Sequence, residues 1–335
     1  MTEDSVVFSE LCKLFGGRMV TNAPLAHLTS SQVGGPADGL ISVQTVDELV
    51  EVAWQLYKIQ VPFLVLGGGS NVLVSDAGFR GVVIHNMARD VHFDMNSHPP
   101  TAWAASGANF GLLARKAVAK DLTGLEWAAG IPGSVGGAVI GNAGAHGSEM
   151  ANNLILAEIL HLFKGIEANN VTADSPKREE WPVNRFDFNY RSSNLKRKSK
   201  VKKNELLQNQ TLQPEYIVLS ALIRLEKGEK ETIRRKLMEF SAYRQQTQPP
   251  GASMGSMFKN PPGDHAGRLI EAAGLKGMRV GQAEISKIHA NFFINLGGAT
   301  ASEIWELIQL VNERVEDRFG IKLDLEIELI GDWIT

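Results

Sequence analysis

The chain has 335 residues, of which 44% are hydrophobic and 21% charged, which is ordinary for a soluble globular protein. Its length predicts two or three domains with hydrophobic cores of their own. A formal net charge of −3 gives no general attraction to nucleic acid or to an anionic membrane. A single cysteine, Cys12, excludes an internal disulfide and a Cys-rich metal site, so no metal is expected. No apolar run could span a bilayer and the first residues do not resemble a signal peptide, so we expect a cytoplasmic protein.

The first third of the chain predicts an α/β arrangement. After a helical lead-in over residues 1–24, Thr45 and Glu48 have the spacing of a capping box, and a helix is expected to begin there. Its buried face is predicted to consist of Leu49, Val52, Ala53 and Leu56. Strands are expected at Leu40–Val43, Pro62–Leu66, Val72–Val74 and Val82–Ile84. Short connections between strand, helix and strand are typical of a βαβ-like unit.

A glycine loop, Gly67–Asn71, separates two of these strands. Consecutive residues without Cβ allow backbone N–H groups to converge on phosphate oxygens, and Ser70 adds a side-chain donor. A strand follows where a dinucleotide fingerprint requires a helix, and no Gly-Lys-Ser/Thr follows, so the loop matches neither that motif nor a P-loop. The alternative is a wide hairpin turn.

A second glycine-rich stretch, Gly124–Gly147, contains eight glycines in 24 residues. A strand over Trp103–Ala108 and a helix over Phe110–Asp121 are expected before it, the helix with an apolar face formed by Leu112, Leu113, Ala117 and Val118. Because large apolar residues are interspersed with the glycines, the stretch is typical of a buried loop that approaches a flat or phosphorylated ligand closely. A tight junction between a turn and a helix is the alternative.

The middle of the chain contains two weak signals between strands expected at Leu154–Phe163 and Tyr216–Leu225. Phe186–Ser193 places three aromatic residues around Arg191, which alone is often a surface cation. Lys196–Lys203 has six basic residues in eight and is interpreted as a solvated surface loop. A nucleic-acid site is the alternative, but no aromatic residue interrupts the lysines.

The C-terminal third is predicted to contain two helices and an alternating strand. A charged helix is expected over Glu231–Tyr243, and Thr300 with Glu303 predicts a second capping box. The residues expected to face inward are Ile233, Leu237 and Phe240 in the first helix and Ile304, Leu307, Val311 and Val315 in the second. Gly320 is expected to end the second helix. The alternation over Ile321–Leu329 predicts a strand.

Six motifs occur in order along the chain: Gly34–Asp38, Leu66–Asn71, Gly130–Gly137 with Asn142–Gly144, Tyr190–Ser192, Gly255–Pro261, and Glu326 before Ile330-Gly331. Together they resemble the UDP-N-acetylenolpyruvoylglucosamine reductases (UDP-N-acetylmuramate dehydrogenases), NADPH-dependent flavin oxidoreductases of bacterial peptidoglycan precursor synthesis. Each motif is weak on its own, but six in the family's order are strong. The longer tyrosine-bearing loop that covers the substrate in one subgroup of the family is not recognisable, so the resemblance is to the shorter-loop subgroup.

The resemblance implies an α+β fold, namely the FAD-binding fold of the vanillyl-alcohol-oxidase type with a C-terminal α+β substrate domain. The implied division is 1–90 for the first FAD-binding subdomain, 91–228 for the second and 229–335 for the substrate-binding domain. FAD is implied as the bound cofactor and NADPH as the co-substrate. The residues implied to hold FAD are Gly67, Gly68, Gly69, Ser70, Asn71, Gly130, Pro132, Gly133, Ser134 and Gly137.

The same resemblance implies the reaction, in which NADPH reduces FAD and leaves, and flavin N5 then passes a hydride to the enolpyruvyl methylene carbon. Negative charge on the neighbouring carbon and its carboxylate requires stabilisation. Arg191 and Glu326 match the family residues that bracket this charge, with Glu326 protonated or sharing a proton. Ser256 matches the residue that delivers a proton to carbon, which a well-placed alcohol can do for so basic a centre. Substrate-binding candidates are Tyr190, Lys259, Asn260 and Arg244.

Two residues depart from the family pattern. Gln32 replaces a usual arginine, and His146 replaces a common tyrosine.

The expected partner is a small-molecule UDP-sugar, with no nucleic acid and no membrane, and the protein is expected to be a monomer. One alternative is an oxygen-using alcohol or lactone oxidase on the same fold, but that chemistry requires a base where Ser256 and Glu326 stand. The other is a non-catalytic nucleotide-sugar or flavin-binding protein.

Overall fold

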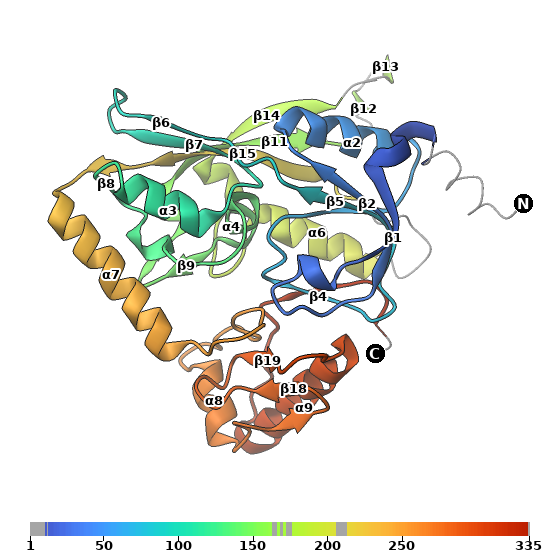
Figure 1. The fold of residues 1–335 in the computed structure, drawn as a ribbon, viewed down its shortest axis with the longest axis vertical. Coiled ribbons are helices and arrows are strands. Elements are labelled where there is room, and N and C mark those ends of the chain that lie inside the picture. Colours follow the sequence, from blue (N-terminus) through green and yellow to red (C-terminus); the bar gives the residue numbers. More distant parts are fainter. Residues whose placement is uncertain are drawn as a thin grey trace, which may run out of the picture. The chain divides into compact units, whose positions relative to one another are not determined.

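The computed structural model describes residues 11, 13–162, 166–167, 170–171, 176–205 and 213–333, with side chains described outside 166–167, 170–171 and 200–205 (Figure 1). The chain separates into two compact units, and each is built from discontinuous segments. The first unit consists of Met1–Thr21, Gly39–Gly67 and Gly81–Phe240, and the second of Asn22–Asp38, Gly68–Arg80 and Ser241–Thr335. The division at 1–90, 91–228 and 229–335 stays a prediction.

A four-stranded sheet begins the fold, in the order β1-β2-β5-β3. Its strands are β1 (Met19–Pro24), β2 (Pro36–Val43), β3 (Phe63–Leu66) and β5 (Phe79–Asn86). Strands β3 and β5 are parallel, with Phe63 opposite Val82. The predicted strands in this region are therefore present, but the helical lead-in is wrong over β1. Residues 1–10 of that lead-in lie outside the described residues.

Helix α2 (Val46–Lys58) packs against this sheet in the first unit. Thr45 caps it, since the Thr45 hydroxyl accepts a 3.1 Å hydrogen bond from the Glu48 N–H. The four apolar residues predicted to face inward, Leu49, Val52, Ala53 and Leu56, are fully buried. The capping signal and the helical period thus predicted this helix correctly.

A second, five-stranded sheet has the order β14-β11-β15-β7-β6 and is antiparallel at each pairing. Its strands are β6 (Val91–Asp94), β7 (Thr101–Ala105), β11 (Leu154–His161), β14 (Lys177–Pro182) and β15 (Tyr216–Arg224). Helices α3 (Phe110–Val118) and α4 (Val135–Gly141) share a hydrophobic core with this sheet. Leu112, predicted to be buried in α3, is 51% exposed, because Phe110, Leu113, Ala114 and Ala117 form the inner face.

The basic run predicted as a surface loop is helical, and forms much of α6 (Asn194–Glu205). Lysine and arginine are good helix formers, and the Ser193 hydroxyl accepts a hydrogen bond of 3.2 Å from the Lys196 N–H. Lys196 is only 7% exposed, so this end of the run is part of the packed structure. The loop interpretation is therefore wrong for the helical part.

Short elements connect these parts of the first unit, and α7 (Lys230–Thr247) ends it. They are η1 (Gly16–Arg18), β8 (Leu122–Thr123), η3 (Glu126–Ala128), β9 (Gly144–Ala145), β10 (Ser148–Glu149), α5 (Met150–Asn153), β12 (Ile166–Glu167), β13 (Asn170–Val171), η4 (Val183–Phe186) and β16 (Glu226–Lys227). Of the inward positions predicted for α7, Ile233 is buried, whereas Leu237 and Phe240 are partly buried. The boundary between the two units falls inside this helix.

The second unit is dominated by α9 (Ala301–Phe319), red in Figure 1. Its other elements are η2 (Ala26–Leu28), β4 (Val72–Val74), α8 (Ala266–Ala272), β17 (Arg279–Val280), β18 (Ala283–Ile285), β19 (Phe293–Asn295) and β20 (Glu328–Ile330). Both halves of the predicted capping box between Thr300 and Glu303 are formed. The predicted inner face of α9 is buried, and Gly320 ends the helix with φ +67°.

The C-terminal strand is much shorter than predicted, since only Glu328–Ile330 forms β20 and pairs in parallel with β4. Just before it, the Lys259 N–H donates to the Asp324 carbonyl at 2.8 Å and the Glu326 N–H to the Met257 carbonyl at 2.9 Å. The chain therefore changes its pairing partner at Glu326–Ile327. The prediction of a single continuous strand over 321–329 is therefore wrong.

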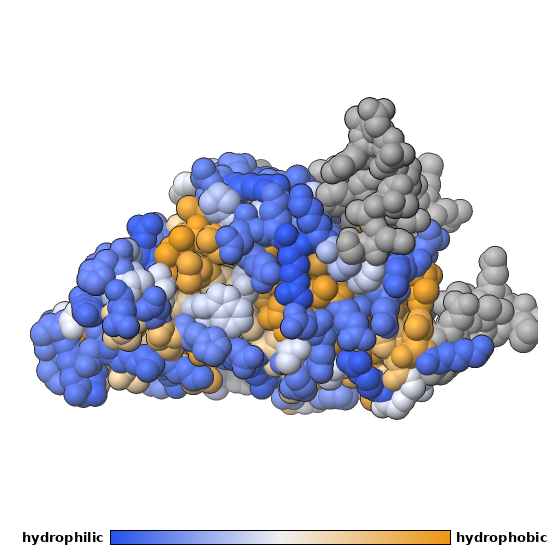
Figure 2. Space-filling model, turned by 90° about the horizontal axis from the view of Figure 1, so that it is seen from above, coloured by the Kyte–Doolittle hydropathy of each residue, from blue (hydrophilic) through white to orange (hydrophobic). Residues whose placement is uncertain are grey.

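Hydrophobic side chains on the face shown in Figure 2 lie in separate patches among hydrophilic ones. Within the described part of the chain, every helix is too short or too polar to span a bilayer.

Candidate active site

Two glycine-rich segments come into contact in the first unit, at Gly67 and Ser134. A Cβ added at Gly67 would overlap the Ser134 side chain, so a larger residue would require Ser134 to move. Ser134 is the N-cap of α4, and its hydroxyl accepts a 3.4 Å hydrogen bond from the Gly137 N–H. Two of the segments implied to bind FAD therefore meet at this point.

The loop that precedes α4 is fixed by backbone hydrogen bonds to residues 106–110. The Phe110 N–H donates to the Gly133 carbonyl at 3.1 Å, and the Gly136 N–H to the Ser106 carbonyl at 2.8 Å. Gly130 and Gly133 have φ of +82° and +104°, a region that residues with a side chain rarely adopt. Pro132 and Gly137 are exposed. The structure thus presents this loop as a rigid, partly uncovered backbone surface.

The remainder of the glycine loop, Gly68–Asn71, belongs to the second unit. Gly69 is buried with φ +57°, and a Cβ there would overlap the Leu28 carbonyl. Among the described residues, the N–H groups of Gly68, Gly69 and Ser70 donate to no backbone carbonyl. Such N–H groups without a backbone acceptor suit phosphate oxygens, and the missing Cβ atoms leave room for close approach. The residues of both glycine-rich segments therefore fit FAD.

Arg191 lies in a tight turn of the first unit. Asn189 and Ser192 exchange two backbone hydrogen bonds of 2.9 and 3.0 Å, and Arg191 between them has φ +53°. Its guanidinium Nη1 donates to the Gly144 carbonyl at 2.8 Å. The Tyr190 ring is half exposed, with its centroid 5.5 Å from the Arg191 Cζ. The turn thus presents a cation beside an aromatic ring.

Ser256 and Glu326, 70 residues apart in sequence, lie on neighbouring segments of the second unit. The Glu326 N–H donates a hydrogen bond to the carbonyl of Met257, the residue after Ser256. The next residue, Phe258, pairs with Leu325. On its other side, Ser256 pairs with Phe292. The structure therefore places two of the three predicted catalytic residues on neighbouring backbone segments, although Glu326 lines neither of the pockets described below. Arg191 belongs to the other unit.

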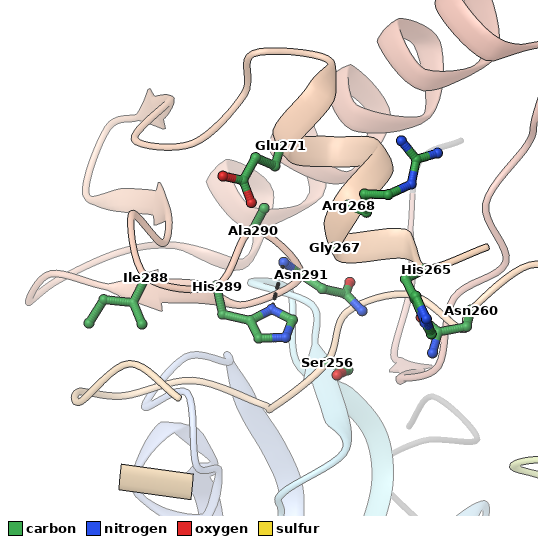
Figure 3. A pocket seen from close by; sticks show the side chains of 10 residues that line it. All are labelled: Ser256, Asn260, His265, Gly267, Arg268, Glu271, Ile288, His289, Ala290 and Asn291. Atoms are coloured by element: carbon green, nitrogen blue, oxygen red, sulfur yellow. Dashed lines mark hydrogen bonds between the residues drawn. The ribbon is translucent and has the colours of Figure 1, made fainter. Parts of the chain in front are cut away.

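A pocket of about 350 Å³ lies next to Ser256 (Figure 3). The loop of Ser256, the segment of His289 and Asn291, and helix α8 each provide part of its lining. Its residues are Ser256, Asn260, His265, Gly267, Arg268, Glu271, Ile288, His289, Ala290 and Asn291. Most of these side chains are polar or charged, which fits a polar or anionic ligand better than an apolar one.

His289 is held in one orientation in this pocket. Its Nδ1 accepts a 3.2 Å hydrogen bond from the Asn291 N–H, so the proton of the neutral ring is on Nε2. Burial lowers the pKa of His289, and the nearby Lys276 lowers it further. The ring is therefore a neutral hydrogen-bond donor at pH 7. The Asn291 side chain also fixes the backbone of Phe258, through bonds of 2.9 and 2.8 Å.

A second pocket of about 420 Å³ shares Ser256 and His289 with the first. Its other lining residues are Tyr243, Gln246, Thr247, Gln248, Ile288 and Phe292.

Among the predicted substrate residues, Asn260 lines the first pocket, and its Oδ1 accepts a hydrogen bond from the Ala266 N–H at 3.1 Å. Lys259 and Arg244 line neither pocket. Burial lowers the pKa of Arg244, and no ion pair to it occurs within the described residues.

Sequence reasoning missed His289, Asn291 and Arg268 as pocket residues. The available signal was weak, since the two histidines of this pocket, His265 and His289, stand in short segments of mixed polarity, residues 263–268 and 287–291. Within the described residues, no cluster of His, Cys, Asp and Glu could hold a metal ion.

The fold and its glycine-rich segments define an FAD-binding flavoprotein. Residues 37–161 match the family described as FAD binding domain, and residues 245–330 match the C-terminal domain of UDP-N-acetylenolpyruvoylglucosamine reductase. The α+β FAD-binding fold and FAD as cofactor, both expected from the sequence, are confirmed.

Relatives over nearly the full length place the chain more narrowly. It is 41% identical over 309 residues to the UDP-N-acetylenolpyruvoylglucosamine reductase of Rubrobacter xylanophilus, covering 92% of this chain and 94% of that protein. Identity to the Bacillus subtilis enzyme of the same name is 39% over 327 residues, covering 97% and 98%. The crystal structure of UDP-N-acetylenolpyruvylglucosamine reductase from Thermus caldophilus has a TM-score of 0.71 and 34% identity, and covers 93% of this chain and 98% of its own.

The chain belongs to the UDP-N-acetylenolpyruvoylglucosamine reductase family. It is a flavin oxidoreductase of a family that serves peptidoglycan precursor synthesis with FAD and NADPH, as the sequence resemblance predicted.

Proposed function

We propose that this chain reduces UDP-N-acetylglucosamine enolpyruvate to UDP-N-acetylmuramate, with NADPH as the source of electrons. The observation that carries the proposal is the backbone hydrogen bond from Glu326 to Met257, which joins the segment of Glu326 to the segment of Ser256, a residue that lines a polar pocket. An enzyme that oxidises an alcohol needs a base at this position, and a serine hydroxyl is a poor one.

When bound, FAD supplies the hydride-transfer chemistry that no side chain can provide. The chain would hold it through the backbone of Gly67–Asn71 and Gly130–Gly137. Ser256 gives its hydroxyl proton to the carbon next to the substrate carboxylate. Arg191 and Glu326, the latter protonated or sharing a proton, stabilise the negative charge that develops on that carboxylate.

The substrate is negatively charged through its diphosphate and its carboxylate. In the pocket beside Ser256, the neutral His289 ring offers an Nε2–H donor, and Asn260 offers its side-chain amide. Arg244, half buried and without an ion pair among the described residues, would bind an anionic oxygen. Tyr190 and Lys259 are proposed as further substrate contacts. These groups support a nucleotide-sugar as the substrate class.

The proposal includes the finer expectations from the sequence. These are a monomer in the cytoplasm, membership of the shorter-loop subgroup, two FAD-binding subdomains over 1–90 and 91–228, and a substrate domain over 229–335.

The test is an anaerobic experiment with the purified holoenzyme. NADPH should bleach the flavin absorbance, and the colour should return when UDP-N-acetylglucosamine enolpyruvate is added, with UDP-N-acetylmuramate as the product. Recovery of the colour only on admission of oxygen would indicate an oxidase and contradict the proposal. Absence of bleaching by NADPH would indicate a non-catalytic flavin-binding protein.

A further inference from the structure

Arg191 adopts a backbone conformation that arginine does not favour. Its φ of +53° lies in the left-handed region, which is unfavourable for a residue with a side chain. Such a conformation persists only where surrounding contacts determine it. The turn Asn189–Ser192 must therefore be fixed from outside, and the contacts that fix it also determine where the guanidinium points.

Asn142 provides one of these contacts. It is fully buried at the C-terminal end of α4, with φ +45°. Its Nδ2 donates to the Asn189 carbonyl at 3.1 Å, and its Oδ1 accepts from the Ala151 N–H at 3.1 Å. Because one partner is an acceptor and the other a donor, only one orientation of the amide satisfies both bonds.

Neighbouring residues tie the other parts of the turn to the same segment. The Ser193 hydroxyl donates to the Ile140 carbonyl at 2.7 Å, and Arg191 itself donates to the Gly144 carbonyl. Residues 140–144 thus contact the turn before Arg191, after it and at its guanidinium. Asn142 is the side chain among them that reaches the start of the turn.

We infer that Asn142 is a positioning residue for Arg191, the cation that acts on the substrate carboxylate. This inference rests on the proposed function, because it gives Asn142 a role in the half-reaction with substrate. Asn142 acts by holding the Asn189 carbonyl, so that the left-handed turn keeps the Arg191 guanidinium against Gly144. The asparagine of the segment that follows the FAD-binding loop therefore serves the chemistry as well as the fold.

The test uses Asn142→Asp in the holoenzyme. Aspartate keeps the acceptor for Ala151 and tolerates the left-handed backbone, but it places an oxygen against the Asn189 carbonyl. Asn152→Asp is the matched control, because Asn152 is exposed and its Oδ1 accepts from the Glu149 N–H at 3.0 Å and from Ser148. The measurements are anaerobic rates of flavin reduction by NADPH and of flavin reoxidation by substrate, and hydrogen–deuterium exchange over 189–192.

For Asn142→Asp, reoxidation by substrate should slow tenfold or more, while reduction by NADPH stays within twofold. Exchange over 189–192 should rise tenfold or more. Asn152→Asp should leave all three unchanged. In an Arg191→Ala background, adding Asn142→Asp should slow reoxidation less than twofold further, because a positioning residue has no effect once its target is gone.

An equal slowing of reoxidation in both backgrounds, or an equal slowing of both half-reactions, would overturn the inference. If Asn142→Asp does not retain FAD, Asn142→Ser is carried through the same cycle, and loss of FAD by both variants would also overturn it. A failure of the proposed function looks different, since Arg191→Ala alone would then leave reoxidation by substrate unchanged.

Discussion

The side-chain amide of Asn71 donates a 3.2 Å hydrogen bond to the backbone carbonyl of Glu326, 255 residues away in the sequence. In return, the Glu328 N–H donates to the Asn71 carbonyl at 2.9 Å. The last residue of the glycine loop therefore fixes the segment that carries the carboxyl group. Cofactor-binding and catalytic candidates are joined directly within the second unit.

The proton-donor role of Ser256 predicts a selective kinetic defect. In Ser256→Ala, flavin reduction by NADPH should stay fast, while flavin reoxidation by the enolpyruvyl substrate should slow by ~10²–10⁴. Stopped-flow absorbance of the two half-reactions checks this. Ser253→Ala is the control, because Ser253 lines neither pocket, and it should behave like the unaltered enzyme. An equal slowing of flavin reduction and flavin reoxidation would contradict the proton-donor role of Ser256.

The contact between Gly67 and Ser134 predicts that FAD binding is sensitive to a single methyl group. Gly67→Ala should weaken FAD binding about tenfold or more, because the new Cβ overlaps the Ser134 side chain and displaces one loop. Fluorescence titration of the apoprotein with FAD measures the change. Gly141→Ala adds the same methyl group where no atom lies within 4 Å apart from its chain neighbours and the backbone of its own helix, and should leave the affinity within about twofold. Equal affinities for the two variants would contradict the prediction.

Asp76 predicts a stability effect that does not involve the cofactor. Its carboxylate accepts hydrogen bonds of 2.8 Å from the Ala301 and Ser302 N–H groups and 2.6 Å from the Ser302 hydroxyl, at the start of α9. Asp76→Ala should lower the free energy of unfolding by about 1 kcal/mol, the usual scale for losing a helix cap. Urea unfolding of the apoprotein measures this. The comparison is Asp47→Ala, at an exposed aspartate in the first turn of α2. If Asp76→Ala lowers the free energy of unfolding no more than Asp47→Ala does, the prediction is contradicted.

Glu179 predicts a pH dependence of stability. Hydrogen bonds from the Arg185 guanidinium at 2.6 Å and the Trp181 N–H at 3.1 Å lower the pKa of the Glu179 carboxyl to about 2. The lowered pKa means that the unfolded chain binds the proton more readily, so this stabilisation is present above about pH 4.5 and is lost as the pH falls toward 2.

Glu179→Gln should therefore destabilise the protein by about 1 kcal/mol at pH 7, the scale for a partly exposed ion pair. The difference from the unaltered protein should shrink below pH 4.5. Chemical unfolding at several pH values measures it. Glu180→Gln, at the neighbouring exposed glutamate, should give no such trend, and a difference at Glu179 that does not depend on pH would refute the assignment.

Local signals predicted the elements that begin with a cap. Thr45 and Thr300 mark the starts of α2 and α9 because capping depends on residues three apart, and the apolar period then identified their buried faces. Leu112 was misplaced because apolar residues occupy more of the α3 surface than its core-facing stripe. The strand predicted over 321–329 was too long. Alternation of apolar and polar residues shows which side chains face inward, but it does not show which strand is the hydrogen-bonding partner.

The site was predictable only in part. Glycine-rich loops have a physical signature, and close contact with a flat or phosphorylated ligand could be proposed for them from missing Cβ atoms alone. Arg191, Ser256 and Glu326 have no local pattern that distinguishes them from surface residues, so their proposed roles came from the resemblance. His289 becomes a candidate only when folding places it beside Ser256.

The second unit is built from three separate segments of the chain, and this limits which recombinants with related proteins would fold. A gene segment encoding 241–335 alone would produce β20 without β4 and α9 without Asp76, since both partners come from Gly68–Arg80. A single crossover at residue 240 would therefore transfer an incomplete unit. Recombination between distant relatives preserves this unit only if residues 22–38 and 68–80 are inherited from the same parent as the C-terminal segment.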